Sequence, residues 1–262
     1  MSLGSRGWSI TSAMQRRLVP DLRYSQTHFE EFLTGHAVRA SAWLDLGCGH
    51  QLLPEWRAEA ERMLLKRVPL VVGVDYDLES LLKHRTIHEL ARADARQLPF
   101  ADDTFDLVTA NMVVEHLDDP AAQFAEVRRV LRPGGAFLFH TPNARSYFVA
   151  TARLLPNGLK RRVAKFLDGR DESDVFPTLY RANRPEDVAQ VAASAGLEVA
   201  DVTLVSSAPV LGAIPPVAAV ELVVLRALQR PSLARYRSNM ICTLRKPAAV
   251  PTTRRVPVAA AS

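Results

Sequence analysis

Residues Asp45-Leu46-Gly47-Cys48-Gly49 place a carboxylate next to a tight turn, directly after the apolar stretch that begins at residue 42. Glycines in such a turn permit positive φ angles and let a ligand come close to the backbone. A helix after the turn would present free N–H groups to an anionic group such as a carboxylate. A single Gly-x-Gly pair is weak evidence, but a predicted strand before it and a predicted helix after it indicate a ligand site.

Two further aspartates stand at the ends of predicted strands. Asp75 follows the apolar residues 70–74, and a carboxylate in that place accepts hydrogen bonds from both hydroxyls of a ribose. A helix N-cap is the simpler interpretation of Asp75, but Asp77 fits the cap better. Asp94 ends the next strand and could accept a hydrogen bond from the exocyclic amine of adenine, while Tyr76 offers the base a flat ring.

Two histidines, His116 and His140, are the candidate general bases, because histidine titrates near neutral pH. His140 ends a buried strand, and a polar residue in that place usually faces the site. For His116 the alternative to catalysis is a structural role at the start of a helix. Tyr24 and His28 could close over the ligand from an N-terminal helix, or they could be ordinary surface residues.

Strand and helix patterns alternate along residues 41–143 and position these side chains. This alternation predicts right-handed crossovers and a parallel sheet with helices on both faces. The predicted strands are residues 43–46, 70–74, 90–93, 105–110, 136–140, 197–205 and 239–244. The predicted helices are residues 21–38, 53–66, 78–88, 121–131, 185–195 with Gly196 as its C-cap, and 216–228.

Composition narrows the class of protein. The chain has 262 residues, of which 48% are hydrophobic and 23% charged, as in ordinary globular proteins. The net charge of +5 is spread along the chain and aromatic residues make up 7%, so we expect no nucleic-acid partner, which would need a basic stripe with stacking aromatics. The two cysteines lack zinc-ligand spacing, so no metal site is predicted and a reducing, cytoplasmic location is expected.

No membrane span is predicted. The N-terminal residues lack the apolar core of a signal peptide. The most apolar stretch, residues 208–228, is split by Pro215-Pro216 and interrupted by Glu221 and Arg226. Its uninterrupted part is shorter than the roughly 20 residues that a span requires, so we interpret it as a buried helix.

Four runs occur in order along the chain: DLGCG, GVDYD, RADARQLPFADDTFDLVTANMVVEHLDDP and VLRPGGAFLFHTPN. Together they resemble class I S-adenosylmethionine-dependent methyltransferases, most closely the branch around the quinone-biosynthesis enzymes and their small-molecule relatives. The resemblance covers residues 42–143, and the strand at 239–244 extends it. It implies an α/β fold with a Rossmann-like, doubly wound, seven-stranded and mostly parallel sheet whose last strand is antiparallel, plus a helical insertion after strand five.

The resemblance also implies binding roles for residues at the strand ends. The methionine end of the cofactor would be held by Asp45, Gly47, Cys48 and Gly49. The ribose would be held by Asp75, and the adenine would meet Tyr76, Asp94 and Ala95. Asn111 would lie near the sulfonium. The sequence departs from the family at His50-Gln51, where a further glycine is usual. A methionine carboxylate is smaller than a pyrophosphate and needs fewer bare backbone positions.

We expect three parts along the chain: residues 1–40, which cover the cofactor site, the methyltransferase domain at 41–246 and a disordered tail at 247–262. Within the first part, residues 1–20 are predicted to be a loose arm that precedes the helix. Residues 144–183 are interpreted as an insertion that caps the acceptor, with Tyr180, Arg181 and Asn183 lining the pocket. A basic amphipathic segment at 159–167 fits either a solvated helix or contact with a membrane surface or lipid-linked substrate.

The expected function is transfer of a methyl group from S-adenosylmethionine to a small-molecule or sugar acceptor, with S-adenosylhomocysteine as product. An acceptor hydroxyl in line with the methyl and sulfur, and a histidine general base, would make this an O-methylation. Three alternatives stay open: C- or N-methylation of a small or lipid-linked molecule, cofactor binding without transfer, and an NAD-dependent oxidoreductase. The sequence lacks the G-x-G-x-x-G fingerprint of dinucleotide binding, which argues against the oxidoreductase. The acceptor and the oligomeric state are not predicted.

Overall fold

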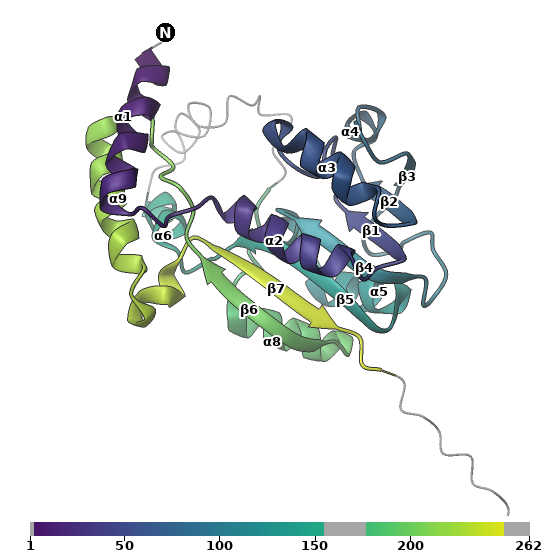
Figure 1. The fold of residues 1–262 in the computed structure, drawn as a ribbon. Helices are drawn as coiled ribbons and strands as arrows, with labels where there is room; N and C mark the ends of the chain where they lie inside the picture. The colour runs from purple at the N-terminus through teal and green to yellow at the C-terminus, as the bar shows by residue number, and fades with distance from the viewer. Residues whose placement is uncertain (1–2, 155–176, 249–262) are drawn as a thin grey trace, which may run out of the picture.

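A seven-stranded sheet with strand order β3-β2-β1-β4-β5-β7-β6 forms the centre of the computed structural model, which describes residues 3–154 and 177–248 (Figure 1). The strands are β1 Ala42–Leu46, β2 Leu70–Asp75, β3 Glu89–Arg92, β4 Phe105–Asn111, β5 Leu131–Pro142, β6 Glu198–Val205 and β7 Asn239–Arg245. Strands β1 to β5 pair in parallel, and β7 is antiparallel to both β5 and β6. The predicted fold class, including the antiparallel last strand, is confirmed.

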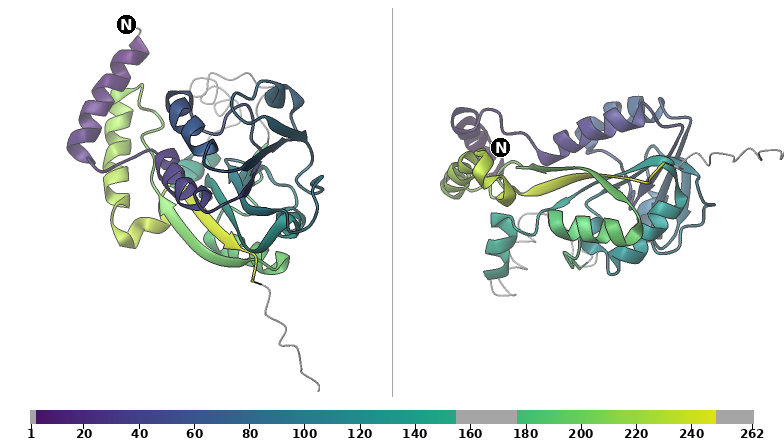
Figure 2. Two further views of the ribbon diagram at one scale, coloured as in Figure 1. Left: turned by 45° about the vertical axis from the view of Figure 1, so that its right-hand side comes forward. Right: turned by 90° about the horizontal axis from the view of Figure 1, so that it is seen from below.

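Helices cover both faces of the sheet. They are α1 Leu3–Leu18, α2 Ser25–Ala37, α3 Ala58–Leu65, α4 Leu78–Leu82, α5 Pro120–Val130, α6 Tyr147–Leu154, α8 Pro185–Ala195 and α9 Pro215–Leu228. Short 3-10 helices occupy Glu55–Arg57, Val114–His116 and Pro231–Tyr236. Figure 2 shows α2 on one face of the sheet and α5 and α8 on the other, while α1 and α9 lie beside it as a pair.

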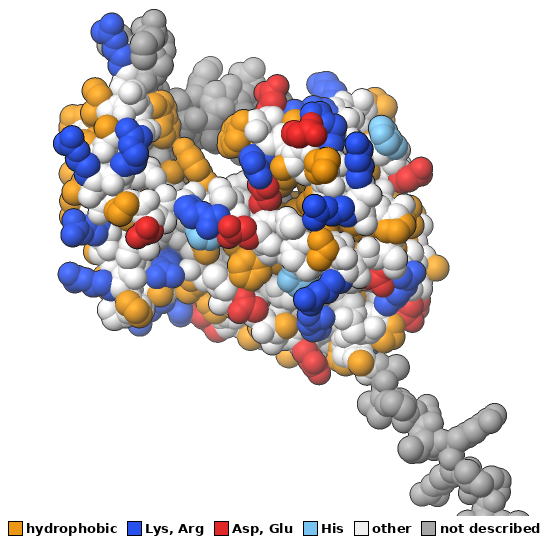
Figure 3. Space-filling view, viewed as in Figure 1, with side chains coloured by type: hydrophobic (Ala, Val, Ile, Leu, Met, Phe, Trp, Pro, Cys, Tyr) orange, Lys and Arg blue, Asp and Glu red, His pale blue; other side chains and the backbone are white. Residues whose placement is uncertain are grey.

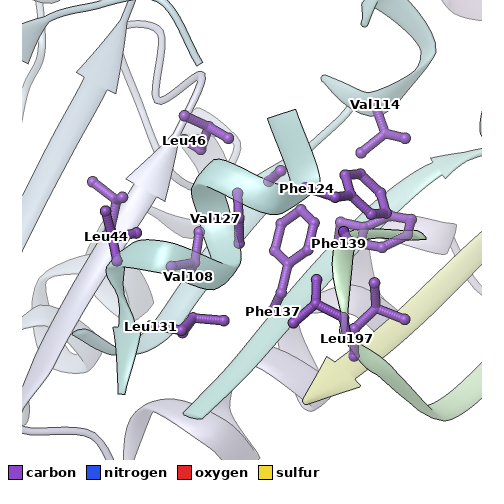
Figure 4. Packing of buried hydrophobic residues seen from close by; sticks show 14 of the residues in the cluster. Leu44, Leu46, Val108, Val114, Phe124, Val127, Leu131, Phe137, Phe139 and Leu197 are labelled. Atoms are coloured by element: carbon purple, nitrogen blue, oxygen red, sulfur yellow. The ribbon is translucent and has the colours of Figure 1, made fainter. Parts of the chain in front are cut away.

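The period of two along the central strands divides their side chains between two apolar cores. On one face Trp43, Leu107 and Leu138 pack with Phe29 and Leu33 of α2. On the other face the intervening strand residues, among them Leu44, Val108, Phe137 and Phe139, pack against α5 with its Phe124 (Figure 4). Burial on both faces explains why these strands are nearly continuous apolar runs in the sequence.

The prediction of a loose arm at residues 1–20 is wrong for residues 3–18, which form helix α1 and pack against α9. Thr11 Oγ1 donates a hydrogen bond to Gly212 O at 2.7 Å, and a Cβ added to Gly7 would lie 2.1 Å from Ala213 O. A third apolar core, separate from the sheet, lies under this helix pair. It consists of Val19, Leu22, Leu222, Leu225 and Leu228.

Two predicted helices are shorter than their apolar patterns indicated. Residues 53–57 form an irregular segment and a 3-10 turn, because Leu52 and Leu53 fill the core under α2 and the buried Glu61 carboxylate accepts a hydrogen bond from Leu53 N at 2.7 Å. Helix α4 ends at Leu82, and Arg85 N then donates to His50 O at 3.2 Å instead of continuing the helix. In both places a tertiary contact outweighs the local helical pattern.

The aromatic cluster beneath β4 and β5 gives a direct test of the packing. Phe124 is fully buried, and its ring meets Phe137 edge to face with 5.2 Å between centroids. We expect Phe124→Ala to lower the free energy of unfolding by about 3–5 kcal/mol, measured by urea denaturation. The control Leu82→Ala, at a side chain that is 78% exposed, should change it by less than about 0.5 kcal/mol. Equal losses in both variants would contradict this assignment of the core.

Candidate active site

The carboxyl ends of β2, β1 and β4 lie side by side at one edge of the sheet. Strand β1 is central, with β2 and β3 on one side of it and β4 and β5 on the other, so the strand order reverses at β1. In open parallel sheets ligands bind at this reversal, beyond the carboxyl ends. The predicted site residues at the ends of β1, β2, β3, β4 and β5 are therefore brought to one edge.

The turn after β1 needs both of its glycines. Gly47 and Gly49 have φ angles of 67° and 55°, a region that side chains other than glycine rarely adopt. A Cβ on Gly47 would lie 2.4 Å from Val113 Cγ2, whereas a Cβ on Gly49 would meet nothing within 4 Å. Gly47 therefore allows close packing against the loop after β4, and Gly49 leaves open space where a ligand could approach.

The backbone amides of this turn are all used within the protein. Gly47 N and Cys48 N both donate to Val74 O, at 2.7 and 3.0 Å, and Gly49 N donates to Asp75 Oδ2 at 2.8 Å. No α-helix begins at the turn, since α3 starts only at Ala58. The predicted helix N-terminus with free N–H groups is therefore wrong: buried amides at a strand exit must be paired, and the end of β2 supplies the acceptors.

Asp75 is held in place by two amides. Besides Gly49 N on Oδ2, Asp77 N donates to Asp75 Oδ1 at 2.9 Å. Each carboxylate oxygen keeps a second lone pair for an external donor. Asp77 itself caps α4, accepting from Glu79 N and Ser80 N, which confirms the predicted cap.

The Asp94 side of the site is more open. Arg96 donates to Asp94 Oδ2 at 2.6 Å, and this hydrogen bond lowers the pKa of Asp94, which therefore stays ionised. Tyr76 is 62% exposed, and the Arg92 guanidinium lies 5.4 Å from its ring centroid. Ala95 is half-buried and follows Asp94 directly. Asp75 and Asp94 follow adjacent strands, as one nucleoside would require.

Asp45 lies beneath the turn, with 3% of its surface exposed. Thr109 Oγ1, on the neighbouring strand, donates to Asp45 Oδ1 at 2.6 Å and accepts from Trp43 Nε1 at 2.7 Å. Burial raises the pKa of Asp45 to about 7. Cys48 is also buried, and burial raises the pKa of its thiol, so Cys48 packs as a small apolar side chain instead of acting as a nucleophile.

Asn111 joins the end of β4 to both α2 and β5. Its Nδ2 donates to Gln26 Oε1 at 3.1 Å, and its Oδ1 lies 2.9 Å from His140 Nδ1. The tautomer of His140 that pairs with Asn111 Oδ1 carries its proton on Nδ1. The lone pair of His140 is then on Nε2, the form that a general base requires.

His140 is enclosed by the protein. Only 2% of its surface is exposed, and its ring stacks on Phe29 of α2 with 5.5 Å between centroids. Within residues 3–154 and 177–248 its Nε2 is buried and has no hydrogen-bond partner. Burial lowers the pKa of His140 to about 4, so the ring is neutral at physiological pH.

His116 lies in a different setting, at the 3-10 helix after β4. Its Nδ1 is 3.1 Å from Pro177 O, and its Nε2 is 3.9 Å from the carboxylate of Glu115. Glu115 is buried, which raises its pKa, and its Oε2 accepts from Thr141 Oγ1 at 2.9 Å. His116 and His140 therefore do not face the same group.

The chain that returns at residue 177 is fixed to these strand ends. Leu179 N and Tyr180 N both donate to Glu115 O, and Tyr180 has a φ of 52°. Asn183 is fully buried, with Nδ2 donating to Thr141 Oγ1 at 2.7 Å and Pro142 O at 2.9 Å. The Asn183 amide nitrogen therefore braces the end of β5, and a role of Asn183 in acceptor binding stays a prediction.

The remaining candidates for acceptor binding lie nearer the surface. Arg181 Nη1 donates to Asp118 O. Tyr24 is 53% exposed, and His28 is partly buried, which lowers its pKa. A hollow of about 210 Å³ lies between the start of α2 and the segment after the glycine turn. It is lined by Tyr24, Gln26, Thr27, Glu30, Pro54, Trp56 and Arg57. The predicted segment at 159–167 lies outside the described residues.

A match to a protein family coincides with this edge of the sheet. The family described as "Methyltransferase domain" matches residues 44–139, from β1 to β5. Residues 44–139 are therefore similar to a methyltransferase domain. The matched residues contain the glycine turn, both aspartates at the ends of β2 and β3, Asn111 and the 3-10 helix that follows β4.

Curated relatives of the methyltransferase domain carry several activities in their names. The chain is 31% identical over 177 residues to a ubiquinone biosynthesis O-methyltransferase of Thiobacillus denitrificans, covering 61% of this chain and 66% of that protein. It is 32% identical over 143 residues to a malonyl-[acyl-carrier protein] O-methyltransferase of Erwinia billingiae (52% and 54%), and 36% identical over 118 residues to a demethylmenaquinone methyltransferase of Corynebacterium kroppenstedtii (43% and 51%). The chain matches less than two thirds of the length of the first relatives found, from 37% to 66%.

Two solved structures share the fold of this chain. The complex of the Haloferax volcanii Trm112 methyltransferase activator with a methyltransferase covers 94% of this chain and 98% of that one, with a TM-score of 0.53 and 18% identity. The [4+2]-cyclase SpnF covers 95% and 98%, with a TM-score of 0.53 and 16% identity. At these identities the likeness is one of fold.

The sequence analysis missed two polar residues that shape the candidate site. Gln26 holds Asn111 from α2, and Thr109 holds Asp45 from within β4. Thr109 could have been found, because a polar residue inside an apolar strand pattern requires a buried partner. Gln26 carries no such signal, since glutamine is ordinary on a helix surface.

The buried carboxyl of Asp45 predicts an unusual dependence of stability on pH. Its folded-state pKa of about 7 exceeds the unfolded value of about 3.9, so the folded state keeps the proton longer. Stability should therefore fall as the pH rises from about 4 to 7, by up to about 4 kcal/mol. Asp45→Asn keeps an acceptor for Thr109 and should remove this fall, measured by urea denaturation at pH 5 and pH 8. The same fall in Asp45→Asn as in the parent protein would contradict the assignment.

Proposed function

We propose that the chain transfers a methyl group from S-adenosylmethionine to a small-molecule or sugar acceptor, most readily at a hydroxyl. The observation that carries the proposal is the coincidence of the methyltransferase-domain match with a bare glycine turn and an oriented carboxylate at the end of β2. S-adenosylmethionine is the cofactor that this domain implies.

The residues at the strand ends fit an adenosyl ligand. Asp75 is oriented by two amides and retains acceptor capacity for ribose hydroxyls, and Gly49 leaves space above the turn. The ionised Asp94 and the exposed Tyr76 ring lie on the side where adenine would bind. Because the turn amides are used within the protein, a methionine carboxylate would need donors outside residues 47–49.

When bound, S-adenosylmethionine supplies a sulfonium methyl that is already electrophilic. The protein then has to hold the acceptor in line with that methyl and exclude water. His140 would accept the proton of an acceptor hydroxyl at Nε2, with Nδ1–H held by Asn111 Oδ1. Because Nε2 is buried in this structure, the transfer requires α2, whose Phe29 stacks on the ring, to move and admit the acceptor. The low pKa of His140 keeps the lone pair available at neutral pH. The names of two relatives, both O-methyltransferases, support oxygen as the acceptor atom.

The ribose assignment predicts a loss of affinity. Replacing Asp75 by Ala removes a charged hydrogen-bond acceptor, so the Kd for S-adenosylhomocysteine should rise about 10- to 100-fold in calorimetry. The control Asp77→Ala removes a carboxylate two residues away that caps α4, and it should leave the Kd within about threefold. Unchanged affinity in Asp75→Ala would reject the ribose assignment. Saturable binding of NADH in place of S-adenosylhomocysteine would favour an oxidoreductase.

The general-base assignment predicts different results for the two histidines. His140→Ala should lower kcat for a hydroxyl acceptor by about 10²- to 10⁴-fold, whereas His116→Ala should change it by less than about tenfold. Because the pKa of His140 is about 4, the parent kcat should show no loss between pH 8 and pH 5.5 from protonation of this base. Acceptors are to be screened by release of S-adenosylhomocysteine. Full activity in His140→Ala would indicate that alignment alone is enough, as a carbon or nitrogen acceptor allows.

A further inference from the structure

Helix α9 is apolar on both of its faces. The inner face packs Leu222, Leu225 and Leu228 into the core shared with the α1 segment. The outer face exposes Val220 and Val223 by 67% and 60%. A helix that faces water normally carries polar residues on its outer side, so this face requires a covering of another kind.

Helix α1 extends the apolar area. Its Trp8 and Ile10 are 41% and 52% exposed, and the Trp8 ring lies against Gly212, two residues before Ile214. Figure 3 shows apolar side chains gathered over α1 and α9 at the left of the molecule, with basic side chains among them, which in these segments are all arginines. We call this area the α1–α9 surface and define it by Trp8, Ile10, Ile214, Val217, Val220, Val223 and Val224.

Arginines make up most of the charge around the α1–α9 surface, and the exposed Asp21 follows α1. The arginines are Arg6, Arg16 and Arg17 of α1, Arg226 of α9, and Arg230 and Arg235 after it. With the residues that the structure describes, none of the six forms an ion pair. The single acidic residue within 3–20 and 214–236 is Glu221, which is buried and accepts hydrogen bonds from Tyr147 Oη and Val210 N, both at 2.8 Å.

We infer that the α1–α9 surface docks on a membrane surface with anionic lipid headgroups. Exposed valines with a tryptophan, bordered by arginines, match the composition of helices that lie in the membrane interface. A span is excluded for α9, because its 14 residues extend about 21 Å, and no helix among the described residues is long and apolar enough to cross a bilayer.

Anionic lipid fits this surface better than a second copy of the chain. In a symmetric dimer the two α1–α9 surfaces would bring their arginines together, and like charges oppose association. Anionic headgroups instead pair with the arginines while the valines reach the acyl boundary, so one partner satisfies both parts of the surface.

The α1–α9 surface is also connected to the candidate active site. The linker after α1 leads into α2, whose Gln26 contacts Asn111, and α9 follows the carboxyl end of β6. Together with the proposed function, this connection implies a lipid-soluble acceptor that enters from the membrane. Only this step of the inference rests on the proposed function.

Vesicle flotation with the full chain tests the docking without requiring activity. The parent protein should float with vesicles of about three parts phosphatidylcholine to one part phosphatidylglycerol, and much less with phosphatidylcholine alone. Val220→Gln/Val223→Gln should lower the partition coefficient at least about tenfold, since two apolar contacts are lost. Arg16→Gln/Arg17→Gln should lower it about fivefold for each arginine, and added salt should have a similar effect.

Matched controls carry the same substitutions elsewhere. Val199→Gln changes an exposed valine of β6, and Arg39→Gln/Arg67→Gln removes two exposed charges near the amino ends of β1 and β2. Both should float like the parent protein, and circular dichroism should show all variants folded. Failure of the parent to float with anionic vesicles, or equal losses in controls and test variants, would overturn the inference. So would a dimer in light scattering that Val220→Gln/Val223→Gln abolishes. Flotation does not depend on methyl transfer, so the proposed function can fail without affecting this result.

Discussion

The attachment of the glycine turn to the end of β2 is the constraint on which the site depends. One carbonyl, Val74 O, accepts two consecutive amides, and the Asp75 carboxylate accepts the third. This arrangement fixes the path of the chain out of β1, and it requires positive φ at Gly47 and Gly49. It also orients Asp75. The same hydrogen bonds thus shape the turn and aim the carboxylate, and the turn forms with His50 in place of a third glycine.

The second half of the site depends on a chain of amides and rings. Gln26, Asn111 and His140 connect α2, β4 and β5, and the stack of Phe29 on His140 closes it from the α2 side. Because α2 supplies both the glutamine and the phenylalanine, the environment of the histidine is set by an element far away in sequence. The fold itself leaves the chemistry open, as the likeness to a [4+2]-cyclase illustrates.

The sheet could be predicted from the sequence because its strands are buried on both faces and read as apolar runs, as in residues 70–74 and 105–110. Short elements could not. Leu52 and Leu53 resemble the start of a helix, yet they serve the core from an irregular segment that Glu61 holds. Helix α1 was missed because its pattern is weak alone and gains its stability from α9. For the site, the strand-end aspartates were visible, whereas the pairing of the turn amides and the burial of Asn183 depend on contacts between distant residues.

The hydrogen bonds from Leu179 N and Tyr180 N to Glu115 O, together with the Asn183 brace, anchor the chain where it re-enters the domain. On the other side of the interval, Tyr147 of α6 is joined to Glu221 of α9. The two attachments therefore fix the chain to separate parts of the fold, one on α9 and the other at the residues that follow β4 and end β5, so loss of one leaves the hydrogen bonds of the other in place.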